Sequence, residues 1–387
     1  MGISKLARMP RFSLRTAVVF LLLATCGVAL REHWDAWTCV STVRILGTEL
    51  PIIEYTSEGP RLLAMRPQDD ARVFDLATGD CVCVLDSCQN YVVSGAFSRD
   101  GHLVAASSVG RSANVWDART GELVALLARH VRRINDLDLS PDGSRLVTAS
   151  DDGTARIWDV RTSTCLRVLK KPNVPRTAVA FLPGGSSVVI GDADGETSIW
   201  NTQTGERTAV LSKAGLWNDS VNPAPETVHF VGPSTDGKLV AAASRGQGIS
   251  IWSLPGGERV GFADIPIGLG ISVGFSPDGS RIVVSGPSRS PQIRDTVGQH
   301  LFTLVGGRHP VVFSPDGNCL LTAVKGTGAK IWRRRRPEWW WGIFWLQEFW
   351  LTVFFSALLL WSLYRDRKYF KSLAAKQPQP SPLEPTE

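Results

Sequence analysis

The sequence predicts an all-β fold made of seven repeated units, and two recurring sequence motifs are the basis for this prediction. The first is a short strand that ends in an aromatic residue and an acid, as in IWD at 157–159. Its middle residue recurs at separations of 42, 42, 42, 52, 42 and 38 residues. The second is a polar turn, SPDG at 140–143, which keeps the same period. A Trp-Asp repeat of about 40–45 residues is typical of the blades of a β-propeller. The seven middle residues are Phe74, Trp116, Trp158, Trp200, Trp252, Arg294 and Trp332.

Each unit reads as four antiparallel strands, a to d, and the third unit shows them most clearly. Residues 134–140, INDLDLS, alternate apolar and polar side chains, as a half-buried strand does. Pro141 and Gly143 then supply a tight turn. The stretch SRLVTAS follows, then the Asp152-Gly153 turn, the strand TARIWD and the strand TCLRVLK. One unit is therefore a four-stranded meander.

Seven strand-c signatures predict a seven-bladed β-propeller at residues 40–333. The ring must close, because an open ring exposes two unpaired strand edges. The seventh unit ends at strand c near Trp332, while residues 40–49, VSTVRILGTE, read as a strand before the first unit. We therefore expect the amino-terminal strand to complete the last blade.

The repeats resemble those of the WD-repeat (G-beta-type) propeller family. In that family a His, a Ser or Thr, an Asp and the strand-c Trp form a buried hydrogen-bond network. The resemblance implies that His130, Thr148 or Ser150, Asp152 and Trp158 form this network in the third blade. The fourth blade keeps Asp194 but has Pro172 in place of the His. The family resemblance also implies a non-enzymatic platform that binds protein partners.

The amino end differs in composition from the repeats. Residues 1–15 are basic and contain no acid, and residues 16–30, TAVVFLLLATCGVAL, are apolar. This pattern predicts either a cleaved signal peptide or a short uncleaved anchor at residues 1–30, with residues 31–39 as a linker. A helix of 15 residues reaches about 22 Å, which is less than the ~30 Å hydrocarbon core of a bilayer.

The carboxyl end predicts a transmembrane helix at residues 339–364. Residues 342–361 supply about one bilayer thickness of mainly apolar sequence. Aromatic residues stand at both ends, as they do at the two interfaces of a membrane. An amphipathic surface helix is the alternative. Residues 365–387 are basic and then Pro-rich, and we expect them to be disordered. The candidate membrane-interface residues are Arg333, Arg334, Arg335, Arg336, Trp339, Trp340, Trp341 and Trp361.

The connectivity predicts which face of the disc carries function. The chain enters at the start of a strand d and leaves at the end of a strand c, and both points lie on the face of the c–d turns. Short linkers would place this face against lipid, so the d–a and b–c loops would point away from the membrane. The basic amino end favours export of the propeller, whereas residues 333–336 favour the opposite topology.

The outward loops are richer in basic than in acidic residues, so we expect an acidic protein partner there. An insertion of ten residues in the fifth repeat adds Trp217, an aromatic anchor in a polar loop. The candidate partner-binding residues are Arg111, Arg132, Arg133, Trp217 and Arg245.

The sequence offers little support for catalysis, cofactors or nucleic-acid binding. The seven cysteines show no metal-ligand spacing, and no phosphate loop or nucleophile elbow is present. No aromatic and basic stacking platform for nucleic acid is visible. We therefore expect a membrane-tethered scaffold without a metal, a cofactor or a small-molecule substrate. A propeller enzyme or envelope-assembly factor with a site in the central channel is the alternative.

Overall fold

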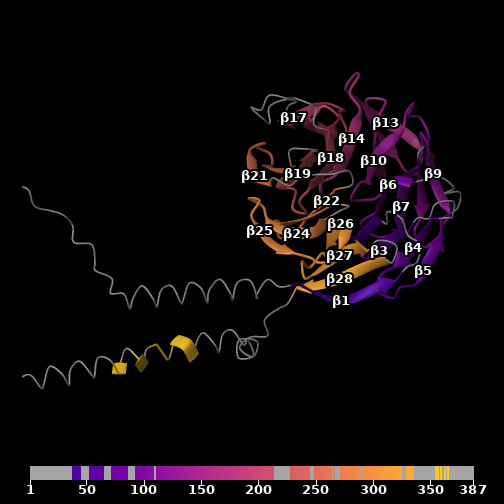
Figure 1. The fold of residues 1–387 in the computed structure, drawn as a ribbon. Helices are drawn as coiled ribbons and strands as arrows, with labels where there is room; N and C mark the ends of the chain where they lie inside the picture. Colours follow the sequence, from indigo (N-terminus) through magenta and orange to yellow (C-terminus); the bar gives the residue numbers. More distant parts are fainter. Residues whose placement is uncertain are drawn as a thin grey trace, which may run out of the picture. The chain divides into compact units, whose positions relative to one another are not determined.

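A computed structural model shows seven antiparallel sheets of four strands, which confirms the all-β, seven-bladed prediction. Each sheet is one blade, and the blades follow one another around a common centre (Figure 1). The structure describes residues 37–44, 52–64, 71–85, 92–108, 110–212, 227–244, 248–263, 265, 271–286, 289–324 and 328–334, and short pieces between 354 and 365.

The first three blades use consecutive strands in chain order. Blade 1 contains β2 (Ile52–Thr56), β3 (Gly59–Ala64), β4 (Arg72–Asp75) and β5 (Cys81–Val84). Blade 2 contains β6 (Val92–Phe97), β7 (Leu103–Ser108), β8 (Ala113–Asp117) and β9 (Leu123–Leu127). Blade 3 contains β10 (Ile134–Leu139), β11 (Arg145–Ser150), β12 (Thr154–Asp159) and β13 (Thr164–Lys170).

The next three blades repeat this order, and blade 7 departs from it. Blade 4 contains β14 (Arg176–Phe181), β15 (Ser187–Asp192), β16 (Thr197–Asn201) and β17 (Arg207–Ser212). Blade 5 contains β18 (Val228–Pro233), β19 (Leu239–Ser244), β20 (Gly248–Ser253) and β21 (Arg259–Ala263). Blade 6 contains β22 (Ser272–Phe275), β23 (Arg281–Gly286), β24 (Arg289–Asp295) and β25 (His300–Thr303). Blade 7 contains β26 (Arg308–Phe313), β27 (Cys319–Val324), β28 (Gly328–Arg334) and β1 (Trp37–Arg44).

The ring is closed by the amino-terminal strand, as the sequence predicts. In blade 7 the strand order is β1-β28-β27-β26, so β1 is the outer strand of the last blade. The indigo β1 lies beside the orange β28 in Figure 1. The strand begins at Trp37, three residues before the expected start at residue 40. Trp37 is the cross-strand partner of Arg334, so the chain enters and leaves the propeller at neighbouring positions.

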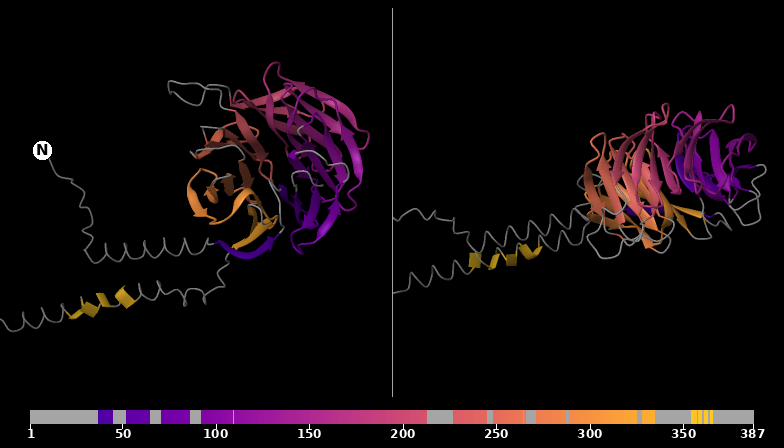
Figure 2. Two further views of the ribbon diagram at one scale, coloured as in Figure 1. Left: turned by 45° about the vertical axis from the view of Figure 1, so that its right-hand side comes forward. Right: turned by 90° about the horizontal axis from the view of Figure 1, so that it is seen from above.

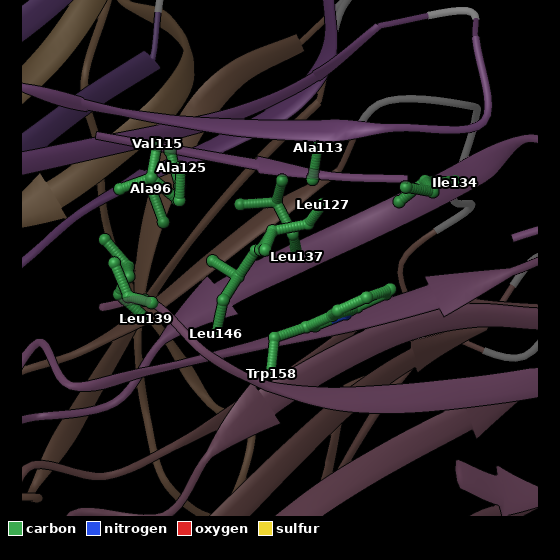
Figure 3. Close-up of a cluster of buried hydrophobic side chains, with 12 residues drawn as sticks. Ala96, Ala113, Val115, Ala125, Leu127, Ile134, Leu137, Leu139, Leu146 and Trp158 are labelled. Atoms are coloured by element: carbon green, nitrogen blue, oxygen red, sulfur yellow. The ribbon is translucent and has the colours of Figure 1, made fainter. Parts of the chain in front are cut away.

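Each seam between neighbouring blades has its own apolar core. The seam between blades 2 and 3 contains Ala125 and Leu127 of β9 together with Leu146 and Trp158 of blade 3 (Figure 3). Side chains of the last and first blades, such as Leu321 and Leu62, form the seam that completes the circle. Burial of one large apolar side chain is worth ~2–3 kcal/mol, so every seam contributes to holding the ring together.

Where an Asp follows the middle residue of a repeat, as at Asp75, Asp117, Asp159 and Asp295, it accepts hydrogen bonds from the turn after it. Asp117 accepts hydrogen bonds from the backbone N–H groups of Arg119 and Thr120, at 2.8 and 3.0 Å. In the SPDG turn, Asp142 accepts from the N–H and the hydroxyl of Ser144. Gly143 has a φ of 68°, a conformation that favours glycine. The Trp-Asp motif therefore has a structural role: the Trp packs in the seam between blades, and the Asp stabilises the turn that follows.

The inner and outer strands of the blades have different surroundings. Strands β6, β10, β14 and β18 lie near the centre of the ring, and strands β9, β13, β17 and β21 lie at its rim (Figures 1 and 2). The strand-a side chains can therefore contact the next blade or the centre, while one edge of every strand d has no strand beside it in the described part of the chain.

The two ends of the chain form a unit separate from the propeller. Residues 37–334 make one compact unit, and residues 1–36 and 335–387 make the other. The expected hydrophobic segments at 1–30 and 339–364 lie mostly outside the described residues, so the flanking helices stay a prediction. No helix among the residues that the structure describes has the length and apolar character needed to cross a bilayer.

Candidate functional site

A buried polar network connects strands of blade 3 at the residues that the family resemblance implies. His130 lies 2.8 Å from Asp152 through Nδ1 and 2.7 Å from the hydroxyl of Thr148 through Nε2. The indole N–H of Trp158 donates to the same hydroxyl at 2.9 Å. Because Thr148 accepts from Trp158, its own hydrogen can go to His130, whose other nitrogen then donates to Asp152.

The electrostatics of this network fit a neutral imidazole beside an ionised acid. Desolvation lowers the pKa of His130, although Asp152 partly opposes that shift. Burial raises the pKa of Asp152, but hydrogen bonds from Thr154 and His130 outweigh it and leave this pKa below its ordinary range. Both side chains are almost completely shielded from solvent. The network therefore stabilises the scaffold and offers no accessible reactive group.

Ser150 has a different partner from the one that the family network would give it. Its hydroxyl donates to the carbonyl of Arg133 at 2.8 Å and so anchors the loop before β10. Thr148 is the hydroxyl residue of the network. Blade 7 keeps half of this arrangement, because Trp332 donates to Thr322 at 2.9 Å.

Blade 4 replaces the histidine network with a cluster of ion pairs, which the sequence reasoning missed. Arg176 and Asp192 are fully buried, and their side chains are 2.6 Å apart. Lys171 lies 2.8 Å from Asp192 and 2.9 Å from Asp194. The guanidinium of Arg176 also lies over the ring of Trp200, 5.3 Å from its centroid.

The repeat period contains the signal for this cluster. A shift of 42 residues places Arg176 on Ile134 and Asp192 on Ser150, and each of these pairs is joined across strands a and b. A base and an acid that replace an apolar residue and a hydroxyl at paired positions indicate a buried salt bridge. Burial raises the pKa of Asp192, and the charges of Arg176 and Lys171 oppose that shift.

Three carboxyl groups on inner strands form a second feature that the sequence reasoning missed. Asp136 and Asp138 of β10 accept backbone N–H groups of β14, from Val179 at 2.9 Å and from Phe181 at 2.7 Å. Glu54 of β2 accepts in the same way from Phe97 of β6 at 3.0 Å. Each acid thus connects the inner strand of its blade to the inner strand of the next.

Desolvation dominates the acid–base behaviour of these three groups. It raises the pKa of Glu54 to about 8, that of Asp136 to about 6 and that of Asp138 to about 7. The negative charge of Asp136 adds to the shift at Asp138. All three side chains nevertheless keep partial solvent exposure. Their hydrogen bonds assign them a structural part in the contacts between blades.

The structure describes three of the five candidate partner-binding residues. Arg111, Arg132 and Arg133 are exposed. Arg111 lies in the loop between β7 and β8, and the other two lie in the loop between β9 and β10. In the described part of the chain, none of the three forms an ion pair. Trp217 and Arg245 lie outside the described residues.

Few of the candidate membrane-interface residues are described. Arg333 is exposed at the end of β28, and Arg334 is half-buried. Trp361 is exposed, with the guanidinium of Arg365 5.4 Å from its ring centroid. Residues 335–336 and 339–341 lie outside the described ranges.

The described residues show no assembly of metal ligands. No group of three or more His, Cys, Asp or Glu side chains in those ranges could hold a metal ion. The cysteines at 39, 81, 83, 165 and 319 are free thiols.

Comparison with known families agrees with the architecture. Residues 79–117 and 121–159 match the family model of the WD domain, G-beta repeat. Each match begins just before an outer strand, β5 or β9, and ends with the third strand of the next blade. No curated protein has a matching sequence.

The two matches and the seven four-stranded blades together support the class of WD-repeat β-propellers. Propellers of this class are generally non-enzymatic scaffolds that mediate contacts between proteins.

Proposed function

We propose that this protein is a membrane-tethered scaffold that binds protein partners through the loops of the d–a and b–c connections. The pairing of Trp37 with Arg334 carries the proposal. Both segments that connect to the hydrophobic ends of the chain start from this one point, at the c–d end of blade 7. A tether that holds the propeller there leaves the d–a and b–c loops free for a partner.

The charge of the free loops indicates the kind of partner. The exposed guanidinium groups of Arg111, Arg132 and Arg133 have no ion pair within the described part of the chain. The backbone of the loop that carries two of them is fixed, because Ser150 and Asp151 bond to the carbonyl of Arg133. A rigid basic loop suits an acidic protein surface, and opposite charges raise the rate of association.

The membrane attachment rests on the sequence of the two ends. Residues 16–30 and 342–361 are apolar, and basic residues adjoin both segments. We place the propeller on the extracytoplasmic side, because large domains cross membranes with little regard to charge and the basic amino end favours the cytoplasm. Protease accessibility of the propeller in sealed vesicles of known orientation tests this assignment.

The scaffold function is tested by charge reversal on the free loops. We expect R111E, R132E and R133E together to abolish co-purification of the partner from solubilised membranes. As a control, R99E with R161E, at two exposed arginines outside these loops, should leave it unchanged. Retention of the partner by the triple variant would contradict the proposed surface. Loss of an enzymatic turnover without loss of the partner would support the alternative of a propeller enzyme.

A further inference from the structure

The outer strand of blade 2 differs from most of the other outer strands in its chemistry. Strand β9, Leu123–Leu127, contains only aliphatic residues and has no charge or proline. Its equivalents β13, β17 and β21 each contain at least one Arg. Charges on an edge strand protect it against pairing with another chain. Strand β9 lacks this protection.

The packing of β9 exposes apolar side chains while it holds the strand in a fixed register. Ala125 and Leu127 are buried in the seam with blade 3 (Figure 3). Leu123, Val124 and Leu126 are exposed by 42, 45 and 54%. Side chains alternate along a strand, so Val124 and Leu126 lie on the face opposite Ala125 and Leu127. Leu123 lies beyond a register shift, because Trp116 pairs with Leu123 and Val115 with Ala125.

The outer edge of β9 is open. The strand is the last in its sheet and pairs only with β8. In the described part of the chain, no backbone or side-chain hydrogen bond reaches this edge. By contrast, Arg167 covers the carbonyl of Leu166 in β13, and the carbonyl of Val297 accepts from Phe262 of β21. Strand β9 therefore offers free N–H and C=O groups beside exposed aliphatic side chains.

The two ends of β9 carry opposite charges. Glu122 is exposed immediately before the strand. Arg129, Arg132 and Arg133 are exposed after it, around the 63% exposed side chain of Val131. Electrostatic attraction therefore favours an added strand that has acidic residues next to the arginines and no acidic residue next to Glu122. In antiparallel pairing this places the acids at the amino end of the added strand.

We propose that β9 binds an extended segment of the partner protein by antiparallel strand addition. In the added strand, aliphatic residues lie beside Val124 and Leu126, and acidic residues lie beside Arg129, Arg132 and Arg133. The inference rests on the proposed scaffold function and names the binding mode of its partner. Main-chain hydrogen bonds to a sheet edge supply affinity, and side chains on alternate positions supply specificity. A lipid surface has no such main-chain groups to offer.

A synthetic peptide tests the proposal on the full chain in detergent. The probe is a fluorescent peptide of three glutamates followed by six residues that alternate valine and threonine. Its control has the same side chains and N-methyl groups on alternate backbone nitrogens, which remove the donors for pairing. We expect fluorescence anisotropy to show binding of the first peptide and at least tenfold weaker binding of the second.

Two substitutions at equivalent positions of different blades provide the matched variants. A shift of 136 residues relates Val124 of β9 to Val260 of β21, which is 43% exposed. We expect V124K to weaken peptide binding at least tenfold and V260K to leave it unchanged. An added lysine would attract an acidic peptide, so weaker binding cannot come from charge. Unchanged thermal midpoints would show that both variants are folded.

The outcomes separate this inference from the proposed function. If R132E with R133E reduces binding but V124K and N-methylation do not, the basic loops bind acidic partners and strand addition is wrong. If neither peptide binds, strand addition is also wrong, whereas the co-purification test still decides the scaffold function. Sedimentation that shows self-association abolished by V124K would assign the edge to a second copy and overturn the proposal.

Discussion

At the scale of single residues, the hydroxyl of Thr148 connects two other buried side chains of the blade 3 network. Its hydroxyl accepts from Trp158 and contacts His130, so it satisfies two buried side chains at once. A buried polar group that loses its partner costs about 1–3 kcal/mol. In blade 7 the corresponding Thr322 accepts a hydrogen bond from Trp332. Leu304 occupies the position that corresponds to His130, so Thr322 has one buried side-chain partner fewer.

Removal of the Thr148 hydroxyl is therefore expected to cost more than the same change in blade 7. We expect T148V to lower the free energy of unfolding by about 2–4 kcal/mol, because it leaves two buried groups unsatisfied. T322V is the matched control and should cost about half as much. Thermal or denaturant unfolding followed by circular dichroism measures both values. Equal losses in the two variants would contradict the network.

Asp138 gives a pH-dependent prediction of the opposite sign to the usual one for an acid. Desolvation raises its pKa from 3.8 to about 7 in the folded protein. A raised folded pKa means that the folded state binds the proton more tightly. Its contribution to stability is therefore complete below pH 4 and is lost as the pH rises to about 7.

The variant D138N keeps a side-chain oxygen that can accept the hydrogen bond from the backbone N–H of Phe181. Its amide group cannot ionise. We expect it to match the wild type near pH 4 and to be more stable at pH 8, by no more than about 4 kcal/mol for a shift of about 3 pH units. D138A removes the acceptor as well as the charge, and it is expected to be less stable than D138N at both pH values. Unfolding curves at pH 4 and pH 8 check this. A stability difference between D138N and wild type that does not change with pH would refute the assignment.

At the scale of the elements, blades 3 and 4 solve one structural problem in two ways. The first cross-strand pair of strands a and b is Ile134 with Ser150 in blade 3 and Arg176 with Asp192 in blade 4. A buried ion pair need not be more stable than an apolar pair of similar size, but loss of one partner is costly because a charge stays buried.

This difference predicts that two substitutions will compensate each other. R176I alone leaves Asp192 buried with Lys171 as its remaining cation, and we expect it to lose about 3 kcal/mol of stability. R176I with D192S copies the pair of blade 3 and should recover most of that loss. A double-mutant cycle measured by denaturant unfolding gives the coupling energy. Additive losses would show that the two residues do not form a unit.

The elements also show what the sequence could and could not predict. Periodicity predicts the strand order, the turns and the closing strand, because Trp, Gly and Asp have to stand at fixed places in each blade. The central pair of the ion-pair cluster escaped prediction because Arg176 and Asp192 stand where blade 3 has an apolar residue and a hydroxyl. The acids at 54, 136 and 138 read as the polar half of an alternating strand. Their contacts with the next blade depend on how the blades pack.

At the scale of the whole molecule, one strand pair performs two tasks. The pairing of β1 with β28 closes the ring and brings residues 37 and 334 together. Because the first and last strands lie in the same blade, the whole propeller must fold before this blade is complete. The same pairing places the two chain ends at one end of blade 7, and the proposed direction of the partner-binding loops depends on it.

A disulfide across this strand pair tests the closure most directly. Thr42 and Lys330 are cross-strand partners, and the substitutions T42C and K330C can be combined with C39S and C319S to avoid wrong pairings. We predict that the disulfide forms in the folded protein and raises the thermal midpoint by about 5 °C or more, since it closes a loop of most of the chain. An out-of-register pair, T38C with K330C, should not form it. A folded protein in which T42C and K330C stay reduced, or cross-link no better than the out-of-register pair, would contradict a ring closed by β1.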